Sequence, residues 1–290
     1  MKILIYGAGA IGSTYAVRFA NAGYDVSVFA RGNRLQSLQD KGLLYIENNS
    51  VKKAVISVIG TLNPDDIFDY IFVTVRYEQV ETALTELKNN NSRNIVTMVN
   101  TPKGYNSWVK IIAEEKLIPA FPGAGGWIEN GVLFYRLTPK IIQPTTFGEI
   151  SGALTDRVMA LRKIFKTSNI PCSISKNMEA WQKCHLALVM PLANGIYFDG
   201  GDNYTTAKNK KALRFMSMSL RKNFRAVKKV GIPITPPKLM ILTICPLWIV
   251  EIALHFLYKS NLGKTVINGH AQIAKEEIQM LDREFNALLG

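Results

Sequence analysis

The sequence predicts an α/β protein with an N-terminal domain built on a parallel sheet, followed by an all-helical C-terminal domain. Two observations favour this fold. Up to residue 175, short apolar runs alternate with amphipathic stretches, which is the pattern of repeated β-α-β units. Beyond residue 175 only helical periodicity continues. We therefore expect domains at residues 1–175 and 176–290, both within the usual size range of single domains.

The first apolar run, residues 2–6, leads into three glycines at G-x-G-x-x-G spacing. An amphipathic stretch follows and ends at Gly23, and residues 24–29 are predicted to form a second strand. In this context the motif indicates a Rossmann-type dinucleotide-binding domain, because the glycines permit a tight turn and let phosphates approach the helix N-terminus. The predicted cofactor-binding residues of this loop are Gly7, Ala8, Gly9, Ala10, Ile11 and Gly12.

The end of the second strand indicates which dinucleotide is bound. An NAD-binding chain places an acidic residue here to hold the ribose hydroxyls, whereas this chain has Ala30 and then Arg31, 19 residues beyond Gly12. A guanidinium can pair with a 2′-phosphate through two parallel hydrogen bonds. The pattern therefore favours NADP(H), with Arg34 as a second candidate. The alternative is that both are ordinary surface arginines.

Two later apolar runs, residues 69–75 and 95–99, are predicted to be buried strands that end in Arg76 and Asn100. The carboxyl ends of parallel strands face the ligand crevice, so both polar residues are candidates for the cofactor site. The alternative is that they simply begin turns, as polar residues commonly do.

The other predicted elements of the first domain have weaker patterns. We expect a hairpin of residues 43–46 and 51–59 that turns at 48–50, a glycine-rich turn at 122–126, and an antiparallel pair of residues 132–135 and 141–142. The remaining predictions are helices at 35–42, 79–87, 108–115 and 155–167, and short strands at 145–150 and 170–175.

The second domain is predicted to contain a helix at 179–190 that Pro191 breaks, a loop at 195–203, a helix at 205–230 and a closing helix at 265–289. Within 205–230, one stripe is apolar and Arg214, Arg221 and Arg225 lie on another face.

The most apolar run, residues 239–258, is long enough to raise the question of a membrane span. Pro246, Glu251 and His255 interrupt it, and a charge at membrane depth is costly. We therefore expect no membrane partner, and a buried helix pair or a contact between two copies in a homodimer instead.

The chain carries a formal net charge of +13, and nine basic residues but no acidic residue lie in 208–229. A solvated helix face is the favoured interpretation over a polyanion site, and stacking aromatic residues are not interleaved as nucleic-acid binding would require. We expect no nucleic-acid partner. Three unevenly spaced cysteines and no secretory signal pattern favour a cytoplasmic protein, and no histidine has metal-ligand spacing.

The motifs together resemble the ketopantoate reductase (2-dehydropantoate 2-reductase) family over nearly the whole chain, most strongly up to residue 45. They are the glycine fingerprint, Ala30-Arg31-Gly32-Asn33-Arg34 followed by Leu38 and Gly42, Thr74-Val75-Arg76, Val99-Asn100, Phe147-Gly148-Glu149, Trp181-Gln182-Lys183 and Ile267-Asn268-Gly269.

The resemblance implies a Rossmann domain, a helical domain and an active site in the cleft, where NADPH reduces a 2-oxo acid such as ketopantoate in pantothenate biosynthesis. Lys183 would match the family lysine that protonates the developing alkoxide. Asn100 would lie near the nicotinamide and the substrate. Arg31 and Arg76 would lie near the adenosine 2′-phosphate. A lysine on an amphipathic helix usually points to solvent, so a surface role for Lys183 stays open.

The chain also departs from the family pattern on the substrate side. Ala187 occupies the place of a helix asparagine one turn after Lys183, and Gly263 and Thr265 stand where two acidic residues are usual. A site without these groups loses much of its discrimination. A second hypothesis is therefore a non-catalytic NADP(H)-binding protein that senses redox state or regulates a partner.

Overall fold

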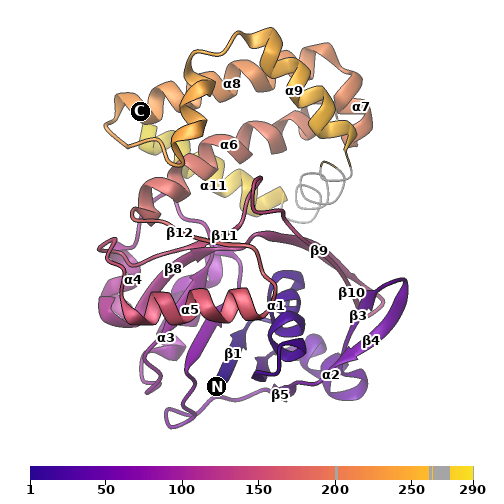
Figure 1. Ribbon diagram of the computed structural model, residues 1–290, viewed down its shortest axis with the longest axis vertical. Coiled ribbons are helices and arrows are strands. Elements are labelled where there is room, and N and C mark those ends of the chain that lie inside the picture. Colours follow the sequence, from indigo (N-terminus) through magenta and orange to yellow (C-terminus); the bar gives the residue numbers. More distant parts are fainter. Residues whose placement is uncertain (200–201, 261–262, 264–274, 290) are drawn as a thin grey trace. The chain divides into compact units, whose positions relative to one another are not determined.

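The computed structural model describes residues 1–199, 202–260, 263 and 275–289. The chain forms two compact units. The first contains Met1–Asn100 and Tyr105–Met178, and the second contains Thr101–Gly104 and Glu179–Gly290. The first unit carries both sheets, and the second is helical (Figure 1). The predicted α/β class, with a helical part after a Rossmann-type part, is confirmed.

The main sheet of the first unit has eight strands in residues 1–178, all of which are described. Its order is β12-β11-β8-β7-β6-β1-β2-β5, and β11 is antiparallel to β8 whereas the other neighbours are parallel. The chain runs from β1 outward to β2 and later returns to β6 on the other side of β1, which makes a topological switch point between β1 and β6. The strands are β1 (Lys2–Tyr6), β2 (Asp25–Phe29), β5 (Ser57–Ile59), β6 (Tyr70–Val73), β7 (Ile95–Met98), β8 (Leu117–Phe121), β11 (Thr145–Phe147) and β12 (Cys172–Ile174).

Helices cover both faces of this sheet because side chains alternate along each strand. On one face an aromatic cluster joins Phe72 of β6 to Phe19 of α1 and Phe165 of α5, with ring centroids 4.9–6.0 Å apart. On the other face Tyr6 of β1 reaches Glu86 of α3. The helical elements are α1 (Ala10–Asn21), α2 (Gly32–Lys41), α3 (Val80–Leu87), α4 (Asn106–Ile111) and α5 (Asp156–Thr167), with 3₁₀ turns η1 (Tyr77–Gln79) and η2 (Glu114–Lys116).

A second sheet contains β3 (Leu43–Glu47), β4 (Ser50–Ala54), β9 (Ala124–Glu129) and β10 (Val132–Leu137) in the order β4-β3-β10-β9. The predicted hairpin is confirmed, since β3 and β4 are antiparallel and Asn48 and Asn49 adopt the left-handed backbone of a tight turn. The predicted strand 51–59 is in fact two strands, because β4 stays in this sheet whereas β5 joins the main one.

Two predictions in this region are wrong. Residues 141–142 form no strand, and Ile141 lies in a turn with 81% of its surface exposed. The actual antiparallel partner of β10 is β9. The predicted turn at 122–126 is also wrong, because residues 124–126 lie in β9. At Gly126 a Cβ would come within 2.3 Å of the Phe134 carbonyl oxygen on β10. This glycine therefore serves a close approach of two strands.

The helices of the second unit are α6 (Met178–Asp199, whose first residue belongs to the first unit), α7 (Asn203–Lys208), α8 (Lys210–Lys229), the 3₁₀ helix η3 (Pro237–Thr243), α9 (Leu247–Lys259) and α11 (Lys275–Leu289) (Figure 1). The predicted helix 205–230 is two helices, because the side chain of Asn209 accepts the Lys211 and Ala212 N–H groups and begins α8. Residues 265–274 of the predicted closing helix lie outside the described residues.

Pro191 does not break α6, and the predicted loop 195–203 is wrong because α6 continues to Asp199. A proline inside a helix leaves the carbonyl four residues earlier without its usual N–H donor. Here that carbonyl belongs to Ala187, and the Asn223 side-chain amide on α8 donates to it at 3.4 Å. A neighbouring helix therefore supplies the donor that proline lacks.

The apolar run of residues 239–258 forms parts of η3 and α9. Among the residues that the structure describes, none of the helices combines the length and the apolar character needed to span a bilayer.

Candidate functional site

The glycine loop lies at the switch point, directly after β1. Gly7 has φ +116°, a backbone conformation that residues with side chains rarely adopt. The Thr74 hydroxyl, at the end of β6, donates to the Gly7 carbonyl at 2.8 Å, and the Thr74 N–H donates to the Tyr6 carbonyl at 2.9 Å. The neighbouring strand therefore fixes the turn that the fingerprint predicts.

Gly12 is closely packed, whereas Gly9 borders open space. A Cβ on Gly12 would lie 1.9 Å from the Gly7 carbonyl oxygen and 2.5 Å from the Thr74 hydroxyl, so α1 packs against the loop in a way that only glycine permits. A Cβ on Gly9 would meet no atom within 4 Å. Gly9 precedes α1, whose first turn holds no acidic residue, and the space beside it is open to an anion attracted by the helix N-terminus.

Arg31 follows β2 by two residues, on the face of the sheet that α3 covers. Its guanidinium stacks on the Phe29 ring, donates to the Tyr6 hydroxyl at 3.2 Å and pairs with Glu86 of α3. The hydrogen bond to Glu86 raises the pKa of Arg31. The pKa of Tyr6 is also raised, chiefly by burial and to a lesser extent by the hydrogen bond with Glu86. The Arg31 side chain is 59% exposed, so an anionic group has access to it.

Arg34 and Arg76 have different environments. Arg34 is turned toward the glycine loop, where it donates to the Ala8 carbonyl at 3.0 Å and to the Ser13 hydroxyl at 3.2 Å, and burial lowers its pKa. Arg34 therefore braces the loop. Arg76 is exposed and follows β6 by three residues.

Asn100 follows β7 by two residues and is 7% exposed. It is the last residue of its chain segment in the first unit. The glycine loop, Arg31 and Arg76 belong to the same unit, whereas Lys183 belongs to the second.

Lys183 is buried on α6, with 9% of its surface exposed, so the alternative of a solvent-facing lysine is wrong. Its ammonium donates to the Glu179 carboxylate at 2.5 Å, one helical turn earlier. Glu179 in turn lies against Gly104, where a Cβ would be 2.9 Å from its Oε1 atom. The ammonium of Lys183 is therefore a buried cation, and the carboxylate of Glu179 that pairs with it is half exposed.

Ala187 and Gly263, which depart from the family pattern, are both closely packed in the structure. Ala187 is fully buried, and its carbonyl accepts the Asn223 amide. Gly263 lies against α9, where a Cβ would be 2.5 Å from the Leu257 carbonyl oxygen. A glutamate at 263 would therefore need the backbone to move. The Ile267-Asn268-Gly269 motif and Thr265 lie outside the described residues.

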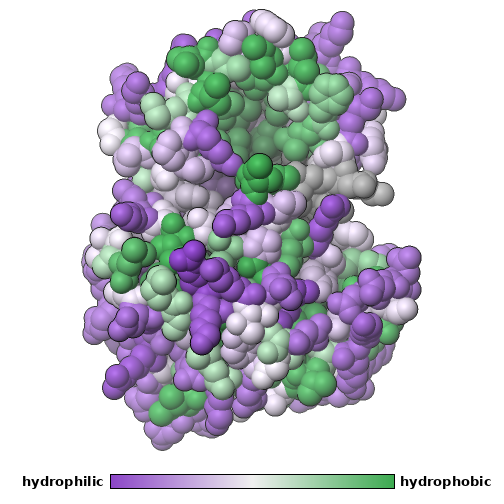
Figure 2. All heavy atoms as spheres, in the orientation of Figure 1, coloured by the Kyte–Doolittle hydropathy of each residue, from purple (hydrophilic) through white to green (hydrophobic). Residues whose placement is uncertain are grey.

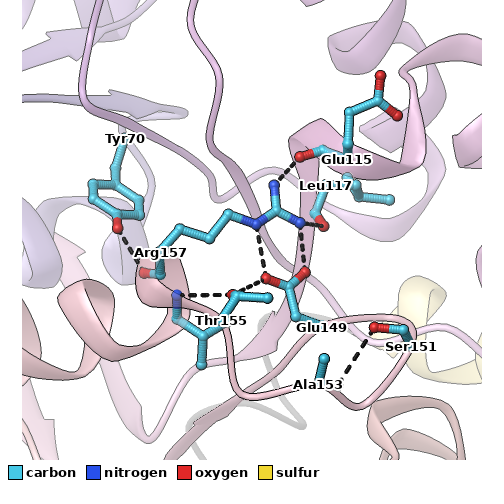
Figure 3. Close-up of polar contacts among 9 residues, drawn as sticks. Tyr70, Glu115, Leu117, Glu149, Ser151, Ala153, Thr155 and Arg157 are labelled. Atoms are coloured by element: carbon cyan, nitrogen blue, oxygen red, sulfur yellow. Dashed lines mark hydrogen bonds and ion pairs between the residues drawn. The ribbon is translucent and has the colours of Figure 1, made fainter.

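Glu149, from the Phe147-Gly148-Glu149 motif, is buried and forms an ion pair of the first unit with the partly buried Arg157 (Figure 3). Arg157 of α5 donates to both carboxylate oxygens of Glu149, at 2.7 and 2.5 Å, and also reaches the Glu115 and Leu117 carbonyls. Burial alone would raise the pKa of Glu149, but the hydrogen bonds from Arg157 and Thr155 outweigh burial and lower it. The motif therefore anchors α5 to the chain around β8.

The sequence interpretation assigned no role to three residues that shape these sites: Glu86, Glu179, and Thr74, which it named only as part of the Thr74-Val75-Arg76 motif. Thr74 and Glu86 act on residues 67 and 55 positions away, so no local pattern indicates them. Glu179 had a usable signal, because an acid four residues before a lysine on a helix lies beside it.

Comparison with known proteins identifies the family. The sequence model of "Ketopantoate reductase PanE/ApbA" matches residues 3–148, which are 146 of the 290 residues. A 2-dehydropantoate 2-reductase of Pyrococcus abyssi is 30% identical over 195 residues, which cover 62% of this chain and 58% of that protein. The enzyme of the same name from Mesorhizobium japonicum is 25% identical over 219 residues, which cover 63% of each chain. The chain thus spans about three fifths of these relatives.

Solved structures share the fold over the whole chain. The 2-dehydropantoate 2-reductase from Porphyromonas gingivalis W83 aligns with 100% of this chain and 99% of its own, at a TM-score of 0.66 and 14% identity. A D-mandelate dehydrogenase in complex with NADH aligns with 99% of this chain and 91% of its own, at a TM-score of 0.73 and 14% identity. Since the family model covers half of the sequence, the chain belongs to the ketopantoate reductase PanE/ApbA family.

Proposed function

We propose that this protein is an NADPH-dependent reductase of a 2-oxo acid, with ketopantoate as the first substrate to test. The observation that carries the proposal is the open space beside Gly9 at the N-terminus of α1, with the exposed guanidinium of Arg31 at the end of the adjacent strand. Family membership supports the same reaction class.

The residues of the first unit fit a dinucleotide phosphate. The loop has a glycine where a side chain would enter the space beside the helix N-terminus, and the first N–H groups of α1 have no acceptor within their own helix. Arg31 suits a 2′-phosphate because a planar guanidinium matches phosphate oxygens, and Arg76 adds a second exposed cation. Asn100, at the end of β7, is proposed to contact the nicotinamide and the substrate.

The bound cofactor would supply a hydride to the carbonyl carbon of the substrate. The reduction also needs one proton on the carbonyl oxygen, and we assign it to the ammonium of Lys183. A buried ammonium stabilises an oxygen that gains negative charge and then transfers its proton to it, which completes the CH–OH group. Glu179 holds that ammonium in place before the transfer.

The test is the oxidation of NADPH by the full chain with a panel of 2-oxo acids that includes ketopantoate. Turnover that falls sharply in Lys183→Met, while NADPH still binds with unchanged affinity, supports the proposal. NADPH binding without turnover on any 2-oxo acid would favour the non-catalytic alternative, which Ala187 and Gly263 on the substrate side motivate.

A further inference from the structure

Two sequence features that the proposed reaction does not use lie side by side in the second unit. One is the apolar run of η3 and α9, and the other is the basic helix α8. Three arginines of α8 join them. Arg214 pairs with Glu251 at 3.0 Å, Arg221 donates to the Cys245 carbonyl, and Arg225 donates to the Thr243 carbonyl at 3.1 Å. Since residue numbers rise along one segment and fall along the other, α8 runs antiparallel to residues 243–251.

Helix α9 exposes apolar side chains on the face away from its own core. Val250, Leu254 and Tyr258 are buried and hold the helix to the unit. The opposite stripe recurs at four-residue intervals with Trp248, Ile252 and Phe256, which are 62%, 50% and 65% exposed. The stripe is therefore not needed for the internal packing of α9.

The apolar surface extends beyond α9. In Figure 2, hydrophobic side chains gather over the helical unit on the face in view. Monomeric proteins rarely expose large contiguous apolar patches unless they bind something there. We call this surface the α9 patch, and its exposed members are Met240, Ile241, Ile244, Trp248, Ile249, Ile252 and Phe256.

The segment that carries α8 and the α9 patch is strongly basic. Residues 203–259 contain eleven lysines and arginines and a single acidic residue, Glu251, which Arg214 already pairs. Lys211, Lys222 and Lys229 are exposed on α8, and Lys259 is exposed at the end of α9. A partner for this surface must therefore accept apolar side chains and offer negative charge.

In place of the sequence-based expectation of no membrane partner, we propose that the α9 patch is a docking surface for an anionic phospholipid bilayer, on which α9 lies in the plane of the interface. Tryptophan, phenylalanine and isoleucine insert at the boundary between headgroups and acyl chains, and the flanking lysines and arginines attract anionic headgroups. Helix α9 has 13 residues, or about 20 Å at 1.5 Å per residue, so it rests on the bilayer and does not cross it.

A second copy of the chain is the weaker fit for the α9 patch. A symmetric dimer brings the same surface from both copies together, so basic residues would face basic residues and the one nearby carboxylate is already paired. An anionic bilayer has no such conflict.

The experiment measures co-sedimentation of the full chain with phosphatidylcholine vesicles and with vesicles that also contain phosphatidylglycerol. Binding should require phosphatidylglycerol and weaken as salt is added. The double variant Trp248→Ser/Phe256→Ser should bind at least tenfold more weakly. Ile67→Ser is the matched control, because Ile67 is 60% exposed in the first unit and its loss should leave binding unchanged.

A second pair of variants tests the charge, since Lys222→Glu and Lys229→Glu change only exposed side chains. Both should weaken vesicle binding without altering the circular dichroism spectrum or the oligomeric state. If the protein does not co-sediment with vesicles that contain phosphatidylglycerol, the proposal is wrong. If light scattering shows a dimer that Trp248→Ser/Phe256→Ser dissociates, the α9 patch joins two copies instead.

Discussion

The ammonium of Lys183 is held by Glu179, one helical turn earlier, at 2.5 Å, although Lys183 itself is almost entirely buried. If Lys183 is the proton donor, Lys183→Met should lower the rate about 10²- to 10⁴-fold with little change in NADPH affinity. Lys208→Met is the control, because Lys208 is exposed on α7. Equal rates for Lys183→Met and wild type would remove Lys183 from the mechanism.

Removing the partner of this lysine should also have a cost. Glu179→Gln leaves a buried ammonium with a neutral acceptor, so we expect about 1 kcal/mol less stability, measured by urea unfolding. The rate should fall less than in Lys183→Met, because the ammonium is still present but is less well positioned. A rate as low as that of Lys183→Met would mean that Glu179 itself takes part in the chemistry.

The two glycines of the loop make a matched pair of variants. Gly12→Ala places a methyl group 1.9 Å from the Gly7 carbonyl oxygen, so both the melting temperature and dinucleotide binding should fall. Gly9→Ala meets nothing in the protein, and its φ of −69° suits alanine, so the fold should survive while phosphate binding weakens. Calorimetric titration measures the affinity of each of the two variants for NADPH. Unchanged NADPH binding in Gly9→Ala would place the phosphates elsewhere.

Glu86 should compete with the cofactor for Arg31. An exposed ion pair is worth up to about 1 kcal/mol, so Glu86→Gln should raise the affinity for NADPH by up to about fivefold and leave the affinity for NADH unchanged. Glu81→Gln, an exposed change on the same helix, is the control. The reverse change, Arg31→Ala, should abolish the preference for NADPH, and a preference that persists would argue against Arg31 as the 2′-phosphate ligand.

The ion pair of Glu149 and Arg157 predicts sensitivity to acid. The folded state lowers the pKa of Glu149 below its usual 4.5, so its stabilising contribution is present above that pH and is lost as pH falls through the lower, folded value. The melting temperature of the wild type should therefore decline more steeply below pH 4.5 than that of Glu149→Gln. Glu114→Gln, an exposed neighbour, should follow the wild-type curve.

Pro191 and Asn223 should be energetically coupled. Asn223→Ala leaves the Ala187 carbonyl without a donor only while residue 191 is proline, so its cost should shrink in the Pro191→Ala background. A double-mutant cycle measured by urea unfolding should give a coupling of about 1 kcal/mol. Additive effects would show that the amide of Asn223 does not compensate for the proline.

The Rossmann-type half of the fold could be predicted because its signals are local. The glycine spacing, the apolar strands and the amphipathic run that predicts α5 each lie within a few residues of the structure that they specify. One failure came from a contact between distant segments, because continuity of α6 through Pro191 depends on Asn223. The other was local, since β9 and β10 are joined by Asn130-Gly131, both at positive φ, which is a hairpin signal that the sequence interpretation overlooked.

The residues of the candidate site also include some that a local motif predicts and some that it does not. The loop residues and Arg31 follow from the motif, whereas Thr74, which fixes the loop, lies 67 residues beyond Gly7. Lys183 was identified by resemblance alone, and its burial could not be inferred because a lysine on an amphipathic helix most often faces solvent.

Residues Thr101–Gly104 belong to the second unit, although the chain on both sides of them belongs to the first. The Lys103 ammonium pairs with Glu284 of α11 at 2.7 Å, and Gly104 packs against Glu179. The polypeptide therefore passes between the units three times, and each unit consists of two separate segments of the sequence. A single cut near residue 178 would give two incomplete fragments, so exchanging the helical unit between relatives requires transplanting this tetrapeptide as well.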